Sequence, residues 1–250
     1  MQRISNELGP YELYDPKNPE HDDPSKYEKT GSTVIGHILA CLTSSRSKNP
    51  VVNLGILFHD LGKAVTRGTK ANGHSNYHGH ESAGVPITQQ IFERLRFCDL
   101  ASEDREAILF AVARHMLIHN LDKLKTGTLV KLILNPGWEV LKDVSFADEA
   151  SRFIDEGFNP SEFNEKIARA EARVHRLGNT SEELRVNIKK FVDGNKLKDW
   201  FEAVRDNPKL IKPILDGVKE FIIEKLDKNI ELSEKDIFNK CAKILKNETL

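Results

Sequence analysis

The sequence predicts an all-α protein, and three observations lead to this fold class. Apolar residues recur at the three- and four-residue spacing of amphipathic helices in most segments after residue 32. Clusters of Pro, Gly and Asn, such as Asn135-Pro136-Gly137, separate these segments at lengths typical of helices. The 250-residue chain is 39% hydrophobic and 30% charged, which is enough apolar material for one sizeable core or a core with a small appendage.

The composition also narrows the classes of function and compartment. The formal net charge of -1 provides no general attraction to nucleic acid, so an RNA partner would need a local basic patch. Cys41, Cys98 and Cys241 lie far apart without a Cys-x-x-Cys pair, which indicates neither a disulfide framework nor a zinc knuckle. The N-terminus lacks an apolar signal core, and no later run is long enough to span a bilayer. We expect a cytoplasmic protein without a membrane partner.

The sequence of residues 1–32 predicts an irregular N-terminal arm, because four prolines interrupt a polar stretch that lacks helical periodicity. His21 and the pair Asp22-Asp23 lie in this arm and could border an active site. We favour the simpler interpretation that the arm is a solvated leader.

Two helices should follow the arm. The first begins near Ser32 and carries His37 beside its apolar face, as a candidate ligand or, alternatively, a core histidine. The second begins at Pro50 and leads through buried residues to the pair His59-Asp60. This pair offers a nitrogen and a carboxylate oxygen, a combination that suits a borderline or hard divalent cation. A structural hydrogen-bonded pair is the alternative interpretation.

The residues after this pair predict a loop close to it. We expect Gly62 to close the helix and Lys63 to project into the loop, where its ammonium group either faces a substrate phosphate or is solvated. Of the histidines that follow, His80 directly precedes a predicted helix and is the preferred candidate ligand, with His78 as the alternative. Glu81 could orient an imidazole or handle a proton, or it could simply stabilise the helix N-terminus.

Four further polar residues complete the set of candidates. A helix that starts near residue 102 carries Arg114 and His115 close to its end. His115 is a candidate ligand, and His119 competes with it because residues four apart share a helix face. Arg114 could neutralise a phosphate or be a surface charge. Asp148 lies among small residues of a later helix that would permit close approach to a metal, and its alternative is an exposed helical acid.

The order of His37, His59-Asp60, His80, His115 and Asp148 resembles the HD-domain superfamily of metal-dependent phosphohydrolases. This resemblance implies an HD-domain helical core. It also implies that one cation binds His37, His59, Asp60 and Asp148, and that Asp60 bridges to a second cation held by His80 and His115. One or two ions of Mn²⁺, Ni²⁺, Co²⁺, Mg²⁺ or Fe²⁺ are expected. The residues expected to take part in catalysis are Asp60, Lys63, Glu81 and Arg114.

Two motifs narrow the resemblance further. Tyr77–Val85 and Ala111–His115 are similar to the HD module that follows the catalytic head of bacterial CCA-adding tRNA nucleotidyltransferases. The likeness spans about Asp15 to Asp148. We expect an HD domain at residues 33–175 and a C-terminal helical extension at residues 176–250. Acidic and basic residues are nearly balanced in the extension, which favours solvated helical faces over a dedicated RNA-binding stripe.

The resemblance implies hydrolysis of phosphoesters in nucleotides or RNA ends, as a 2',3'-cyclic phosphodiesterase, 2'-nucleotidase or phosphatase, and tRNA is a candidate substrate. Too few residues precede His37 for a nucleotidyltransferase head, so nucleotide addition is not expected. Two alternatives stay open. The chain could be a non-catalytic RNA-binding subunit that works beside a separate nucleotidyltransferase, or it could hydrolyse deoxynucleoside triphosphates or signalling nucleotides.

Overall fold

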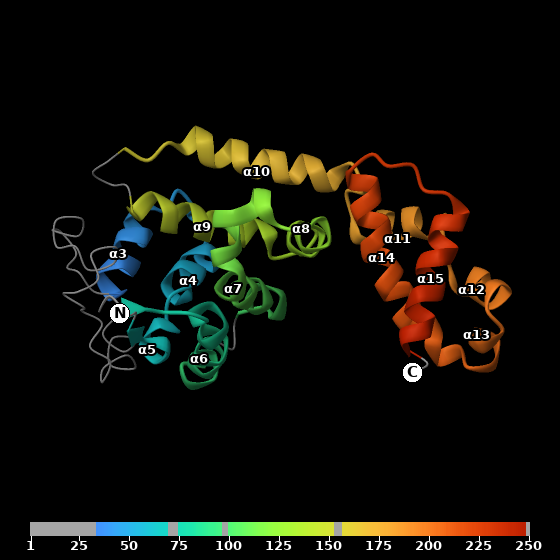
Figure 1. The fold of residues 1–250 in the computed structure, drawn as a ribbon. Helices are drawn as coiled ribbons and strands as arrows, with labels where there is room; N and C mark the ends of the chain where they lie inside the picture. Colours follow the sequence, from blue (N-terminus) through green and yellow to red (C-terminus); the bar gives the residue numbers. More distant parts are fainter. Residues whose placement is uncertain (1–33, 70–74, 97–99, 153–156, 249–250) are drawn as a thin grey trace. The chain divides into compact units, whose positions relative to one another are not determined.

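The computed structural model describes residues 34–69, 75–96, 100–152 and 157–248 (Figure 1). The predicted N-terminal arm, and with it His21 and Asp22-Asp23, lies outside these residues, as do His74 and Cys98. The described chain is helical apart from two short strands, β1 (Gly68–Thr69) and β2 (Ser75–Asn76), which pair antiparallel. The predicted all-α fold class is confirmed.

The chain divides into two compact units by its internal contacts. Unit 1 comprises residues 1–120 and 136–165, and unit 2 comprises residues 121–135 and 166–250. The predicted domain boundary at residues 175 and 176 stays a prediction. Within the described residues, no helix combines the length and the apolar character needed to cross a membrane.

The helices of unit 1 pack around α9 and position the site. The helices that lie wholly in this unit are α3 (Val34–Ser44), α4 (Pro50–Phe58), α5 (Lys63–Thr66), α6 (His80–Arg94), α7 (Ser102–Arg114) and α9 (Trp138–Arg152). The unit also includes the first turns of η1 (His115–Lys123) and α10 (Pro160–His175). Helix α9 contacts α3, α4 and α7, and almost every residue from Val144 to Ser151 is buried. A β-carbon at Gly55 of α4 would lie 2.7 Å from a methyl group of Val144, so the glycine allows α4 to approach α9 closely.

Local signals account for the ends of these helices. Asn49 caps α4, because its side chain accepts a hydrogen bond from the Val51 N–H, and Pro50 occupies the first turn as expected. The predicted interruption at Asn135-Pro136-Gly137 separates α8 (Thr126–Ile133) from α9. Gly79 precedes α6 with a φ of 77°, a left-handed conformation that a glycine adopts without strain.

Unit 2 is built around α14. Besides α8 and the end of α10, its elements are α11 (Ser181–Lys189), α12 (Gly194–Trp200), α13 (Glu202–Asp206), η2 (Pro208–Leu210), α14 (Ile211–Asp227) and α15 (Glu234–Glu248). Helix α14 buries Ile214, Val218 and Ile222 at four-residue spacing and contacts α8, α11, α12 and α15. Arg173 of α10 and Asp227 of α14 form a part-buried ion pair at 2.7 Å.

Candidate metal centre

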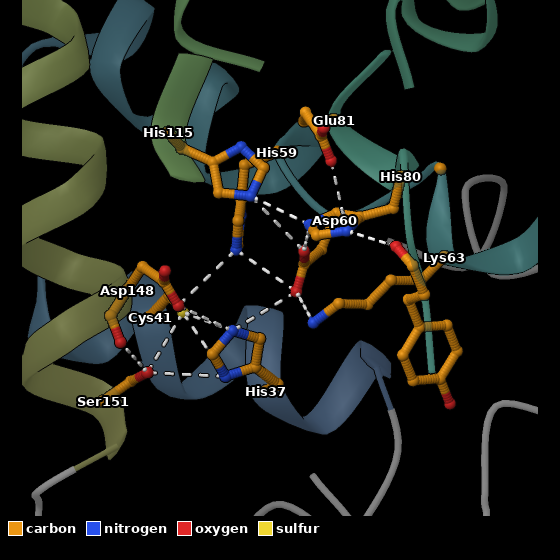
Figure 2. A network of polar contacts seen from close by, with 12 residues as sticks. His37, Cys41, His59, Asp60, Lys63, His80, Glu81, His115, Asp148 and Ser151 are labelled. Carbon is orange, nitrogen blue, oxygen red and sulfur yellow. Dashed lines mark hydrogen bonds and ion pairs between the residues drawn. The ribbon is translucent and has the colours of Figure 1, made fainter. Parts of the chain in front are cut away.

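Six polar side chains from separate elements of unit 1 meet in one buried cluster (Figure 2). His37 lies on α3, and Asp148 lies on α9. His59 and Asp60 lie in the turn after α4, His80 is the first residue of α6, and His115 directly follows α7. Each of them is at most 6% exposed. These six are the predicted ligands His37, His59, Asp60, His80, His115 and Asp148. The structure therefore brings all predicted ligands together, and their binding of a metal stays a prediction.

Asp60 stands between two groups of histidines because its two oxygens face in different directions. Its Oδ2 lies 3.4 Å from Nε2 of His37 and 3.4 Å from Nε2 of His59. Its Oδ1 lies 3.3 Å from Nε2 of His80 and 3.8 Å from Nε2 of His115. One carboxylate can thus reach two adjacent positions, as a bridging ligand does.

Backbone contacts fix the orientation of three of these imidazoles. Nδ1 of His59, His80 and His115 lies 2.7, 2.8 and 2.9 Å from the carbonyl oxygen three residues earlier in each case. Because a carbonyl only accepts, each Nδ1 must carry the proton that it donates. In the neutral ring the Nε2 lone pair then faces the centre of the cluster, as it does in a metal-ligating histidine.

The positions of the imidazole nitrogen atoms at the centre of the cluster are better explained by a bound cation than by direct contacts between the rings. Nε2 of His80 lies 3.1 Å from Nε2 of His115, and two lone pairs at this distance repel unless a proton or a cation lies between them. Nε2 of His59 is buried and has no hydrogen-bond partner among the described residues. Cations bound at the centre of the cluster would satisfy all three nitrogen atoms.

Two sets of donor atoms can hold a metal ion. His37, Cys41, His59 and Asp148 form one set, and Asp60, His80 and His115 form the other, with the atoms of each set within 4.8 Å of one another. Imidazole nitrogen and carboxylate oxygen suit first-row transition metals and Zn²⁺. The donor sets therefore fit the divalent cation that the sequence predicts.

The two carboxylates are ionised despite their burial. Burial opposes ionisation of Asp60, but Lys63 and His59 outweigh it and hold the pKa of this carboxyl well below its usual range. Burial likewise opposes ionisation of Asp148, and Arg152 leads the contacts that hold its pKa well below the usual range. The Arg152 guanidinium donates to both oxygens of Asp148, at 3.1 and 3.0 Å.

Burial and the neighbouring carboxylates shift the pKa values of the histidines in opposite directions. It lowers the pKa of His37, and with the positive charge of His59 it lowers the pKa of His115 to about 3. Burial also disfavours the charged form of His59, but Asp60 beside it outweighs this effect and raises the pKa of His59. His119, at the edge of the cluster, has a raised pKa because its ring contacts Asp148 and Glu149.

The position of Lys63 corrects the prediction that it projects into a loop. Lys63 begins α5, is 3% exposed, and donates from Nζ to Oδ2 of Asp60 at 2.6 Å. Helix α4 ends at Phe58, and Gly62 has a right-handed φ of -64°, so Gly62 does not close the helix as expected. Its role is close packing, because a β-carbon there would lie 1.9 Å from the carbonyl oxygen of His80.

The other candidates lie at or beyond the edge of the cluster. Glu81 is partly exposed, and its carboxylate lies 3.6 Å from Nδ1 of His80. Arg114 is exposed at the end of α7, because its side chain points about 100° around the helix from the inward-facing His115. His78 is exposed, whereas His80 is buried in the cluster. The catalytic roles of Glu81 and Arg114 stay predictions.

Three residues of the cluster were missing from the predicted set. Cys41 lies one turn after His37, and Ser151 and Arg152 lie one turn after Asp148. The Cys41 thiol donates to Oγ of Ser151 at 3.3 Å and is 3.5 Å from Nε2 of His37. The spacing of three or four residues along a helix was the available signal, because it places these side chains on the same face as a predicted ligand.

The fold and the cluster together define a helical unit with buried side chains that could hold a divalent metal. Residues 34–133 match the HD domain, the domain of a superfamily of metal-dependent hydrolases. Asp148 lies beyond the matched residues. The structure thus places Asp148 in the cluster, although the matched residues do not include it.

Curated relatives match part of the chain. A multifunctional CCA protein of Legionella pneumophila (strain Paris) is 31% identical over 112 residues, which cover 44% of this chain and 26% of the relative. A multifunctional CCA protein of Shewanella frigidimarina (strain NCIMB 400) is 36% identical over 111 residues, which cover 44% and 25%. The match thus spans about a quarter of the length of these relatives. No solved structure matches the chain.

Proposed function

We propose that this chain is a metal-dependent phosphohydrolase of nucleotides or RNA ends, acting as a 2',3'-cyclic phosphodiesterase, a 2'-nucleotidase or a phosphatase. The observation that carries the proposal is the position of Asp60, whose two oxygens face His37 and His59 on one side and His80 and His115 on the other. This arrangement supports two adjacent cation positions. The six side chains are too few to saturate two octahedral ions, which leaves coordination positions for exchangeable ligands.

The charges of the cluster favour an anionic substrate. The carboxylates of Asp60 and Asp148 are balanced by Lys63 and Arg152, which contact them at 2.6 and 3.0 Å. A bound divalent cation would therefore leave the cluster positively charged, would lower the pKa of a coordinated water and would neutralise charge on a phosphoryl group. Lys63 and Arg152 hold the two carboxylates in place for this task.

The relatives support the class of substrate. Both are named multifunctional CCA proteins, and each matches 44% of this chain. We therefore place RNA ends, including those of tRNA, and nucleotides before other phosphoesters. A separate nucleotidyltransferase is the protein partner that this likeness suggests.

A metal-by-substrate screen tests the proposal. The purified chain is assayed with Mn²⁺, Ni²⁺, Co²⁺, Mg²⁺ and Fe²⁺ against 2',3'-cyclic nucleotides, 2'- and 3'-nucleotides, deoxynucleoside triphosphates and a generic phosphoester. We expect metal-dependent release of phosphate or opening of the cyclic ester. Asp60→Asn should abolish it, since the neutral amide is a far poorer ligand.

Asp143→Asn is the matched control, because this aspartate lies on α9 outside the cluster and its pair with Arg46 is partly exposed. Its activity should equal that of the wild type. RNA binding without hydrolysis under any metal would contradict the proposal and favour a non-catalytic accessory subunit. Triphosphate release from deoxynucleotides would instead favour the other enzymatic alternative.

A further inference from the structure

The side chain of His37 is oriented differently from the other histidines of the cluster. His59, His80 and His115 each direct Nδ1 to a carbonyl oxygen three residues earlier. Nδ1 of His37 instead lies 3.4 Å from a side-chain hydroxyl, Oγ of Ser151 on α9 (Figure 2). The two residues are far apart in sequence, so only the packing of α3 against α9 creates this contact.

The hydrogen bonds of Ser151 determine what its hydroxyl can do for His37. The hydroxyl proton goes to the carbonyl oxygen of Asp148 at 2.8 Å, and the Cys41 thiol donates to the same Oγ at 3.3 Å. A hydroxyl has only one proton to donate, so toward His37 the Ser151 oxygen can only accept. The contact therefore favours the tautomer of His37 that carries its proton on Nδ1.

This tautomer matters because Nε2 of His37 is the atom that faces the carboxylates, 3.0 Å from Oδ1 of Asp148 and 3.4 Å from Oδ2 of Asp60. With the proton on Nδ1, the Nε2 lone pair is available to a cation. With the proton on Nε2, the ring would donate to Asp148 and could not ligate a metal. The two arrangements compete, and only the first supports the proposed function.

We infer that Ser151 is a positioning residue of the metal centre, which accepts the Nδ1 proton of His37 and so presents Nε2 to a divalent cation. This inference rests on the proposed function. Ser151 touches no substrate in this role and acts only through His37. The same hydroxyl also ties the end of α9 to α3, which fixes the ring of His37 against the carboxylate of Asp148.

Titration of the metal-free protein with Zn²⁺ alone, followed by calorimetry, tests the inference. Ser151→Ala should weaken Zn²⁺ binding by about 10- to 100-fold, the usual effect of removing a group that orients a metal-ligating histidine. Ser145→Ala is the matched control. Ser145 is equally buried on α9, one turn before Asp148, and its Oγ has no hydrogen-bond partner among the described residues. This control should bind Zn²⁺ as tightly as the wild type does. Ser151→Thr keeps the hydroxyl and should retain most of the wild-type affinity for Zn²⁺.

A spectroscopic measurement separates positioning from a general loss of structure. In the Zn²⁺-loaded wild type, the Nδ1–H resonance of His37 should exchange slowly with solvent in ¹⁵N-edited NMR spectra, because its proton is hydrogen-bonded. The resonance should exchange rapidly in Ser151→Ala and stay unchanged in Ser145→Ala. Equal Zn²⁺ affinity of the wild type and Ser151→Ala would overturn the inference and leave the proposed function intact. A wild type that binds no Zn²⁺ would instead count against the metal site itself.

Discussion

At the scale of single residues, the unusual feature of this protein is a lysine side chain buried beside the candidate metal ligands. Lys63 is 3% exposed and donates to Asp60 at 2.6 Å, although lysine is rarely buried unless it is paired. The pair explains why Asp60 keeps a pKa well below its usual range in a site that burial would otherwise neutralise. Lys63 therefore stabilises the charged form of Asp60 in the absence of a metal.

Replacement of Lys63 tests this role. Lys63→Met removes one partner of a buried ion pair and leaves Asp60 without its closest cation, so the metal-free protein should lose about 3–5 kcal/mol of unfolding free energy. Added Zn²⁺ should then raise the melting temperature more in the variant than in the wild type, because the cation supplies the missing positive charge. Thermal unfolding with and without Zn²⁺ measures both effects.

Lys228→Met is the control for this change, because Lys228 pairs with Glu224 at 2.8 Å on an exposed surface. Such exposed pairs contribute little to stability, so this variant should unfold close to the wild type. A Lys63→Met protein as stable as this control would contradict the role assigned to Lys63.

At the scale of secondary-structure elements, one carboxylate joins three helices of unit 2. Asp227 at the end of α14 accepts from Arg173 of α10 at 2.8 Å and from the Thr126 hydroxyl of α8 at 2.6 Å. Arg173 also donates to Oγ1 of Thr126 at 2.7 Å, which closes the network. Burial opposes ionisation of Asp227, but the hydrogen bonds from Arg173 and Thr126 outweigh it and lower the pKa of this carboxyl.

The lowered pKa predicts how the stability of unit 2 depends on pH. A carboxyl whose folded pKa is depressed contributes stability above its unfolded pKa, about 3.9, and loses it as the pH falls toward the folded value. Asp227→Asn should thus cost about 1–3 kcal/mol at neutral pH, and the difference from the wild type should shrink in acid.

Urea unfolding at a series of pH values checks this prediction. Glu182→Gln removes the exposed pair with Arg185 at 2.8 Å and should cost little at any pH. A cost of Asp227→Asn that stays constant from neutral to acid pH would show that the ionised carboxylate is not the source of the stability.

At the scale of the whole molecule, the candidate metal centre lies within unit 1. All its donor atoms, from His37 to Asp148, lie in residues 1–120 and 136–165. A cation that binds only the folded state stabilises the elements that it joins. We expect Zn²⁺ to slow amide hydrogen exchange in α3, α4, α6, α7 and α9, and to leave α11, α12 and α15 unchanged. Exchange followed by mass spectrometry measures this, and equal protection of both groups of helices would contradict it.

The sequence by itself determined the helices and the kinds of residue that could form a site. Helical spacing, the Asn49-Pro50 start of α4 and the break at Asn135-Pro136-Gly137 are local signals, and local signals survive without knowledge of the packing. The motif order also sufficed to select all six candidate ligands, since each lies in a short recognisable segment.

Only the tertiary structure decided how these residues act together. The burial of Lys63 against Asp60 arises because Gly62 lets this turn approach the first turn of α6, where a β-carbon would collide with the backbone of His80. The hydroxyl of Ser151 reaches His37 because α9 packs on α3. Contacts between residues far apart in the chain depend on the distances between helices, and no local sequence pattern encodes these distances.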